Sequence, residues 1–133
     1  MFTDEDLIYS YSREQAIADG VLIDLSARYP EICSEHYKWP VACTSSIWNL
    51  IQLFADEADG ASPAGVVHDI LWMSRFPIRK YQEGVGETCI FLFCIPEAVQ
   101  MKMHTGPEPQ LKIHVGPNDN GEPCITIMMP EED

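Results

Sequence analysis

The residues of this chain that are best suited to chemistry are cysteines and histidines with the spacing of metal ligands. Cys33 and His36 are separated by two residues, and Cys43 follows further along the chain. Thiolate sulfur and imidazole nitrogen are the atoms that zinc prefers in structural sites, which use four ligands. No fourth ligand is found nearby, so coincidence in a loop is the alternative. Because the set is incomplete, we expect no metal and no cofactor, although the sequence alone does not decide whether these three residues bind a metal.

A second candidate is the dipeptide His68-Asp69, which looks like the His-Asp pair of metal-dependent phosphohydrolases. That chemistry needs further histidines and an aspartate on neighbouring helices to complete the metal shell. His36, His104 and His114 fall in expected loops and a strand without suitable spacing. No nucleophile elbow or phosphate-binding glycine loop is present either. A hydrolase or transferase with a site near His68 is therefore the least favoured function.

The polar side of one expected helix carries residue types that anchor protein interfaces. At about 100° per residue, this side lies opposite Val66 and Ile70. Tryptophan and arginine are enriched among the residues that contribute most to protein binding. The alternative is that another part of the same domain, such as the N-terminal segment, covers the tryptophan. The candidate interface residues are His68, Trp72, Arg75 and, if the helix continues past Pro77, Arg79.

The helices that must position these residues are predicted from caps and apolar periodicity. A capping box predicts a short helix over residues 12–20, which a glycine closes. A threonine or serine cap and an amphipathic pattern predict a helix over 44–58. A proline at its first position begins a third helix over 63–76, where a Phe-Pro pair ends or kinks it. We interpret residues 26–42 as irregular or as a short helix plus a loop.

Alternating apolar residues predict the strands. Asn120-Gly121 tolerates the positive φ angles of a type I′ turn, so the last two strands should form a hairpin. The unbroken apolar run at 89–95 suits a central strand covered on both faces. We interpret the polar segment 96–109 as a long loop. The predicted strands lie near residues 21–25, 88–95, 110–116 and 123–129.

These elements predict the fold class. The helices precede most of the strands, so we expect an α+β domain rather than a parallel βαβ sheet. The sheet should be mostly antiparallel, with about four strands and two or three helices packed on one face. A chain of 133 residues is interpreted as one globular domain, 1–133, in which residues 1–11 form an arm.

The charge of the chain restricts its partners. Eight lysines and arginines against 21 acidic residues give a net charge of −13. Phosphate binding normally needs clustered positive charge, so direct nucleic-acid binding is disfavoured. No apolar run reaches the roughly 18–20 residues that cross a bilayer, and the acidic N-terminus lacks the build of a secretory signal. We therefore expect a cytoplasmic protein with reduced, partly buried cysteines.

Several short segments resemble a family of small uncharacterised proteins that is widespread in phages, plasmids and integrated mobile elements of bacteria. The resemblance covers nearly the whole domain in the same order, and it implies a setting without an activity. The matching segments are YSR at 11–13, QAI at 15–17, DGVLID at 19–24, WPVA at 39–42, Trp48, DILWM at 69–73, IR at 78–79, GPNDNGEP at 116–123, ITI at 125–127 and PEED at 130–133.

The sequence therefore favours a non-catalytic accessory or regulatory protein of a mobile element that binds another protein. The binding surface would be the face around Trp72 and Arg75 or the edge of the C-terminal hairpin. Alternatively, a second copy of the chain binds that face, and the protein forms a homodimer through Trp72. The alternative function is an inhibitor of host defence whose acidic surface mimics nucleic acid.

Overall fold

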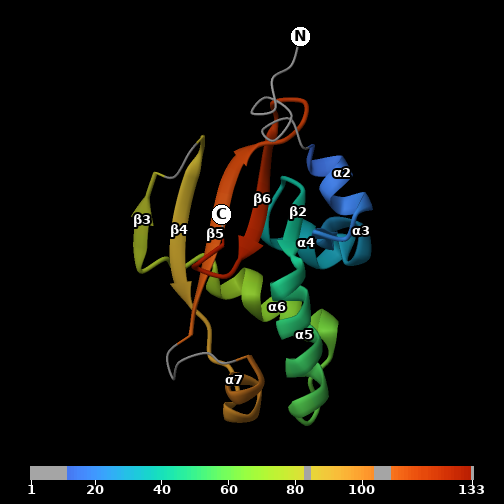
Figure 1. Cartoon of the computed structure of the whole chain (residues 1–133), viewed down its shortest axis with the longest axis vertical. Helices are drawn as coiled ribbons and strands as arrows, with labels where there is room; N and C mark the ends of the chain where they lie inside the picture. Colours follow the sequence, from blue (N-terminus) through green and yellow to red (C-terminus); the bar gives the residue numbers. More distant parts are fainter. Residues whose placement is uncertain (1–11, 83–84, 104–108, 133) are drawn as a thin grey trace.

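The strands of this protein form one continuous sheet. The structure, a computed structural model, describes residues 12–82, 85–103 and 109–132. Its six strands lie side by side in the order β1-β2-β6-β5-β4-β3 (Figure 1). The strands are β1 (Leu22–Asp24), β2 (Val41–Thr44), β3 (Arg79–Tyr81), β4 (Glu87–Leu92), β5 (Gln110–Pro117) and β6 (Pro123–Met128).

The α+β class and the mostly antiparallel sheet are confirmed, but the predicted numbers of strands and of helices were both lower than those found in the described residues. Only β2 and β6 pair in parallel, whereas the other neighbouring strands are antiparallel. The four expected strands correspond to β1, β4, β5 and β6. The strands β2 and β3 were missed. β4 lies next to the edge strand β3, and its Leu92 is exposed, so the expectation of a central strand covered on both faces was wrong.

Six helices accompany the sheet in the described part of the chain. Three of them match the predicted helices, and α6 ends at Met73, before the Phe76-Pro77 pair. The segment interpreted as a long loop contains α7, whose Val99 is buried in the core. The proposed arm, residues 1–11, lies outside the described residues. The helices are α2 (Arg13–Ala18), α3 (Leu25–Arg28), α4 (Pro30–His36), α5 (Ser45–Glu57), α6 (Pro63–Met73) and α7 (Glu97–Met103).

Helices α5 and α6 pack against each other, and α4 packs against α6. The predicted caps are present: Ser12 Oγ accepts the Gln15 amide, and Thr44 Oγ1 accepts the Ile47 amide. Alternate residues of the central strands point into one core, as in the opposed pairs Phe91 and Leu111 of β4 and β5. None of the described helices is long and apolar enough to cross a membrane.

The C-terminal hairpin occupies the middle of the sheet. β5 and β6 pair over their whole length, and each has a further strand on its other side. The edges of the sheet are therefore β1 and β3, and the hairpin offers no free edge to a partner. The Gly121 amide donates to the Asn118 carbonyl at 3.0 Å, which closes a turn whose central residues are Asp119 and Asn120. The type I′ turn centred on Asn120-Gly121 was therefore wrong, although Gly121 does have a positive φ of 80°.

The hairpin turn is joined to the first helix by charged groups. The two carboxylate oxygens of Asp119 accept the backbone amides of Arg13 and Glu14, at 2.8 and 3.0 Å. The Arg13 guanidinium in turn donates to Thr126 Oγ1 and to the Ile125 carbonyl, each at 2.7 Å. These contacts connect segments more than 100 residues apart in the chain. They give the YSR, GPNDNGEP and ITI segments a structural role.

The PEED segment closes the opposite end of β6. Glu132 accepts hydrogen bonds from Thr44 Oγ1 at 2.7 Å and from the Met129 amide at 2.9 Å. Thr44 also caps α5, and the buried Lys112 ammonium donates to the Glu132 carbonyl. The conspicuous polar residues of the C-terminal segment are therefore used to hold the sheet to its helices.

Substitution of Asp119 by asparagine should change the acid sensitivity of the protein. The amides of Arg13 and Glu14 hold the pKa of Asp119 below its ordinary value of 3.8. As the pH falls through that region, the unfolded state binds the proton first, so the unfolding free energy of the wild type decreases. We expect Asp119→Asn to be less stable at neutral pH and to lack this part of the pH dependence.

Urea unfolding over a series of acidic pH values measures this difference. The control is Asp59→Asn, which makes the same charge change in the turn after α5. A stability difference between Asp119→Asn and the wild type that stays constant at all pH values would show that the charge of Asp119 does not stabilise the contact with the Arg13 and Glu14 amides.

Candidate functional site

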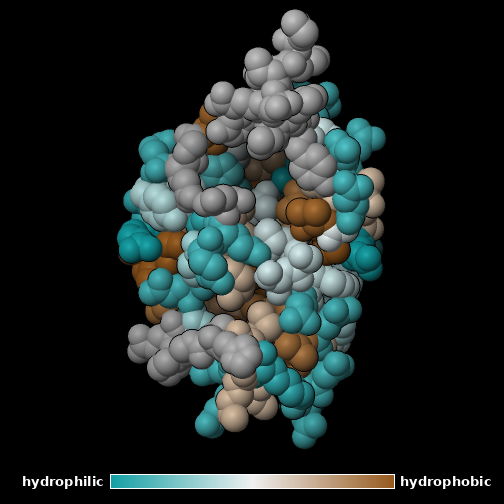
Figure 2. Space-filling view, viewed as in Figure 1, coloured by the Kyte–Doolittle hydropathy of each residue, from teal (hydrophilic) through white to brown (hydrophobic). Residues whose placement is uncertain are grey.

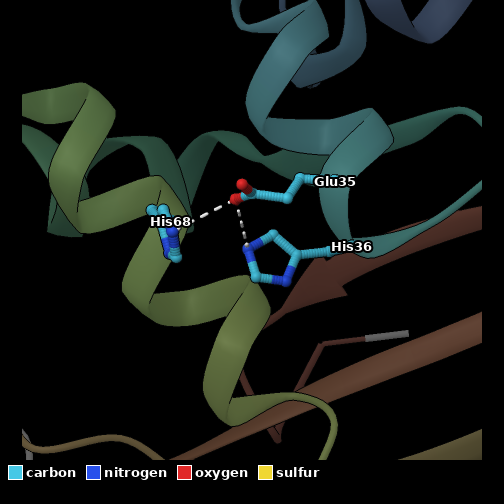
Figure 3. Close-up of side chains that lie close together, drawn as sticks. All are labelled: Glu35, His36 and His68. Carbon is cyan, nitrogen blue, oxygen red and sulfur yellow. Dashed lines mark ion pairs between the residues drawn. The ribbon is translucent and has the colours of Figure 1, made fainter.

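Helices α4 and α6 bring two histidines and a glutamate to one point. Glu35 and His36 are the last residues of α4, and His68 projects from the middle of α6 toward them (Figure 3). Glu35 Oε2 lies 3.2 Å from His68 Nε2 and 3.8 Å from His36 Nε2. The two imidazole rings meet edge to face with their centroids 4.8 Å apart. One carboxylate oxygen therefore stands between two imidazole nitrogens.

The His36 side chain is buried without a hydrogen bond. Only 2 % of it is exposed, and neither of its ring nitrogens has a hydrogen-bond partner in the structure. The Nδ1 atom of His68 is also buried and without a partner. Buried polar side chains are nearly always hydrogen-bonded, and each unsatisfied group costs about 1–3 kcal/mol. Three such nitrogens in one cluster are therefore an expensive arrangement that needs a physical reason.

The surroundings keep His36 in the neutral form. Burial lowers the pKa of its imidazole below the ordinary value of 6.5, and His68 and Arg75 lower it further, whereas Glu35 raises it. Because burial is the largest of these effects, His36 is uncharged at neutral pH. A neutral imidazole carries a free lone pair on one nitrogen and can accept a proton, a hydrogen bond or a metal ion.

The cysteines do not join this cluster. Among the described residues, Glu35, His36 and His68 form the one group of three whose ligand atoms lie within 4.8 Å of one another. Cys33 and Cys43 are buried in the hydrophobic core instead. Burial raises the pKa of the Cys33 thiol and raises that of Cys43 to about 12, which disfavours the thiolate form that binds zinc. The structure thus gives no support to a site built from Cys33, His36 and Cys43.

Next to the histidines lies an exposed aromatic surface. Trp72 is 46 % exposed, so the described part of the domain does not cover it. Its ring meets His36 on one side, with centroids 6.3 Å apart, and Phe76 on another, at 5.7 Å. The Arg75 guanidinium lies 5.2 Å from the centre of the Trp72 ring. Phe76 and Ile78 are each 55 % exposed and extend the apolar surface.

The structure places the four candidate interface residues in two groups. His68, Trp72 and Arg75 lie on the exposed side of α6 and the turn after it, opposite the buried Val66 and Ile70, as the periodicity predicts. Arg79 is separated from them by the end of the helix. It begins β3, and its guanidinium lies 5.6 Å from the centre of the Tyr81 ring.

An open depression adjoins His68 at the start of α6. Its volume is about 280 Å³. The face of the molecule in Figure 2 is mainly hydrophilic, and its hydrophobic side chains form separate small groups. The residues that line the depression are Phe54, Gly60, Ala61, Ser62, Gly65, Val66, His68 and Asp69.

The cluster contains one histidine from each of the two metal sites that were considered from the sequence. His36 was considered with the cysteines and His68 with Asp69, whereas Glu35 was missed. The two histidines are far apart in the chain, and only the packing of α4 on α6 brings them together. In the sequence, the adjacent Glu35-His36 pair is only a weak indication of a ligand site. Its role becomes visible when α4 packs on α6. His104 lies outside the described residues.

The comparisons with known proteins identify a family and no activity. A family model described as a family of unknown function (DUF6573) matches residues 1–70, which is more than half of the chain. This range includes Glu35, His36 and His68 but ends before Trp72 and the C-terminal hairpin. No curated protein and no solved structure matches the chain.

Proposed function

We propose that this chain, which belongs to the family of unknown function, is a non-catalytic module that binds another protein. The binding surface is the Trp72 face, which we define as Trp72, Arg75, Phe76 and Ile78. In the setting implied by the resemblance, the protein is a cytoplasmic accessory or regulator of a bacterial mobile element.

The observation that carries this proposal is the exposed, already ordered tryptophan. Trp72 is held between His36 and Phe76, and Arg75 stacks on it. A rigid aromatic side chain loses little conformational freedom when a partner covers it. Tryptophan and arginine are also the residues that most often dominate binding energy. The cluster thus has the composition and rigidity of an interface anchor.

The charges of this surface favour a partner that presents carboxylates beside an apolar group. Arg75 is exposed on the Trp72 face, whereas Arg79 begins β3 and Lys80 pairs with Glu87. A second copy docked by two-fold symmetry would bring the Arg75 side chains of both copies into one interface, and like charges opposed across an interface are costly. A different protein with an acidic and apolar patch fits better than a second copy.

The alternative functions have less support. For mimicry of nucleic acid, carboxylates must face outward together, but several of them have partners within the chain: Glu57 pairs with Lys102, Glu87 with Lys80, and Asp119 and Glu132 act as clamps. A hydrolase or transferase near His68 is favoured by the adjoining depression and the neighbouring His36 and Glu35. No described side chain is assigned as its nucleophile.

Affinity capture from the cell that carries the gene tests the proposal. The wild type is compared with Trp72→Ala and Arg75→Glu by quantitative mass spectrometry. We expect one protein to be lost at least roughly 30-fold from the Trp72→Ala capture, because removal of a dominant interface residue costs about 2 kcal/mol or more. Arg75→Glu should also lower recovery, and higher salt should weaken the interaction because it screens the arginine.

The matched control is Met101→Ala, which removes an exposed apolar side chain from α7. This variant should recover the partner as well as the wild type does. Equal recovery by Trp72→Ala, or equal loss by Met101→Ala, would contradict the proposal. Recovery of a second copy of the chain alone would show that the face serves self-association.

A further inference from the structure

We propose that Glu35, His36 and His68 bind one first-row divalent transition-metal ion, which joins the end of α4 to α6. This goes beyond the proposed function, which needs no metal, and it departs from the expectation of no metal drawn from the sequence. The three side chains come from two packed helices and converge on one point (Figure 3).

The three ligand atoms lie within 4.8 Å of one another, and the two distances from Glu35 are close to those of ligands that share an ion. Nitrogen and oxygen ligands lie about 2.0–2.1 Å from zinc, so two ligands of a tetrahedral ion are roughly 3.3 Å apart. Glu35 Oε2 and His68 Nε2 are separated by 3.2 Å. Glu35 Oε2 and His36 Nε2 are 3.8 Å apart and would approach by a few tenths of an ångström. Glu35 and the His68 side chain are partly exposed and have room for this adjustment.

The independent observation is the buried imidazole of His36. Its side chain is 98 % buried, and both ring nitrogens lack a hydrogen-bond partner while the ring is directed toward Glu35 and His68. An ion bound at Nε2 would satisfy this nitrogen and remove part of the cost of burying it. Edge-to-face packing of the rings alone leaves that cost in place. A structural water would also satisfy the nitrogen, and the experiment below separates a water from a metal.

The ligand types select the class of metal. Imidazole nitrogens together with one carboxylate suit zinc, cobalt, nickel or iron(II), whereas calcium and magnesium prefer oxygen ligands. Two histidines and a glutamate are also the three protein ligands of some catalytic zinc sites, in which water fills the fourth position. Zn²⁺ is therefore the probe of choice, and Co²⁺ adds a visible absorption spectrum that reports its coordination.

The experiment titrates Zn²⁺ into the chelator-treated full-length protein by calorimetry. We expect one ion per chain and a rise in the thermal unfolding midpoint on addition of Zn²⁺. Glu35→Gln and His68→Ala should each weaken binding at least about 100-fold, because even outer-shell changes at metal sites cost 10–100-fold. Both side chains are partly exposed, so these variants should fold even if changes at the buried His36 do not.

Two control variants separate this site from others. His114→Gln alters a histidine that pairs with Thr88 on the sheet, and Cys94→Ser removes the exposed thiol. Both should bind Zn²⁺ like the wild type. Absence of saturable Zn²⁺ binding would overturn the proposal, as would a Zn²⁺ affinity of Glu35→Gln and His68→Ala equal to that of the wild type.

Discussion

Substitution of Gly86 by alanine should destabilise the protein by about 3 kcal/mol or more. Gly86 precedes β4 with a φ of 108°, which side chains rarely tolerate and which costs of order 1–3 kcal/mol. An added Cβ would also overlap the Val115 carbonyl oxygen and lie 2.9 Å from the Gly116 Cα. Because both neighbours are backbone atoms of β5, the two strands must separate, and such overpacking typically costs a further 1–3 kcal/mol. Urea unfolding measures the loss.

Gly121→Ala is the matched control for this effect. Gly121 also has a positive φ, of 80°, but an added Cβ there would meet nothing within 4 Å. We therefore expect only the conformational cost of the left-handed region, about 1–2 kcal/mol. Equal losses for the two alanine variants would show that the close approach of Gly86 to β5 is not a source of instability.

Substitution of Arg13 by alanine should cost about 3 kcal/mol. The Arg13 guanidinium donates to Thr126 and to the Ile125 carbonyl, and both hydrogen bonds are partly buried. A hydrogen bond from a charged donor contributes about 1.5–3 kcal/mol, and its removal leaves acceptors on β6 unsatisfied. Arg13→Lys should recover only part of the loss, because an ammonium does not have the planar fork that reaches both acceptors.

Arg28→Ala is the matched control, because it removes the same positive charge as Arg13→Ala. Arg28 is exposed, and its guanidinium lies over the Trp48 ring at 4.8 Å. Contacts of this kind at exposed sites are worth about 0.5–1 kcal/mol, so this variant should lose much less stability. Similar unfolding free energies for Arg13→Ala and Arg28→Ala would contradict the view that Arg13 joins α2 to the hairpin.

Local patterns in the sequence predicted the helices α2, α5 and α6 and four of the strands. Ser12, Thr44 and the proline at the start of α6 mark helix N-termini through groups that act within one turn of chain. Strict alternation identified β5 and β6, since a half-buried strand needs it. These features depend only on residues that are close in sequence, so they can be predicted without the structure.

The missed elements depend on distant parts of the chain. β3 consists of Arg79, Lys80 and Tyr81, which have no apolar pattern and form a strand because β4 lies beside them. β2 is short and pairs in parallel with β6, so no turn between the two strands indicates their pairing. α7 was read as loop because of its flanking prolines and polar residues, yet Val99 and Met103 anchor it to the core.

The candidate site shows the same division. The exposed side of α6 follows from helical periodicity, and the sequence therefore predicted His68, Trp72 and Arg75 as neighbours. The approach of Glu35 and His36 to His68 needs the packing of α4 on α6, which no local pattern encodes. Three residues of the segments that carry the family resemblance, Arg13, Asp119 and Glu132, also have structural roles, because their hydrogen bonds join elements that are distant in sequence.

Photo-crosslinking in the cell tests the central claim, that the Trp72 face binds another protein, most directly. A photoreactive phenylalanine analogue at Phe76 replaces one exposed aromatic ring by another, and the same analogue at Met101 of α7 serves as the control. We predict a single adduct with a different protein from position 76, its loss in the Arg75→Glu background, and no adduct from position 101. No adduct at position 76, equal adducts at both positions, or an adduct with twice the mass of the chain would contradict the claim.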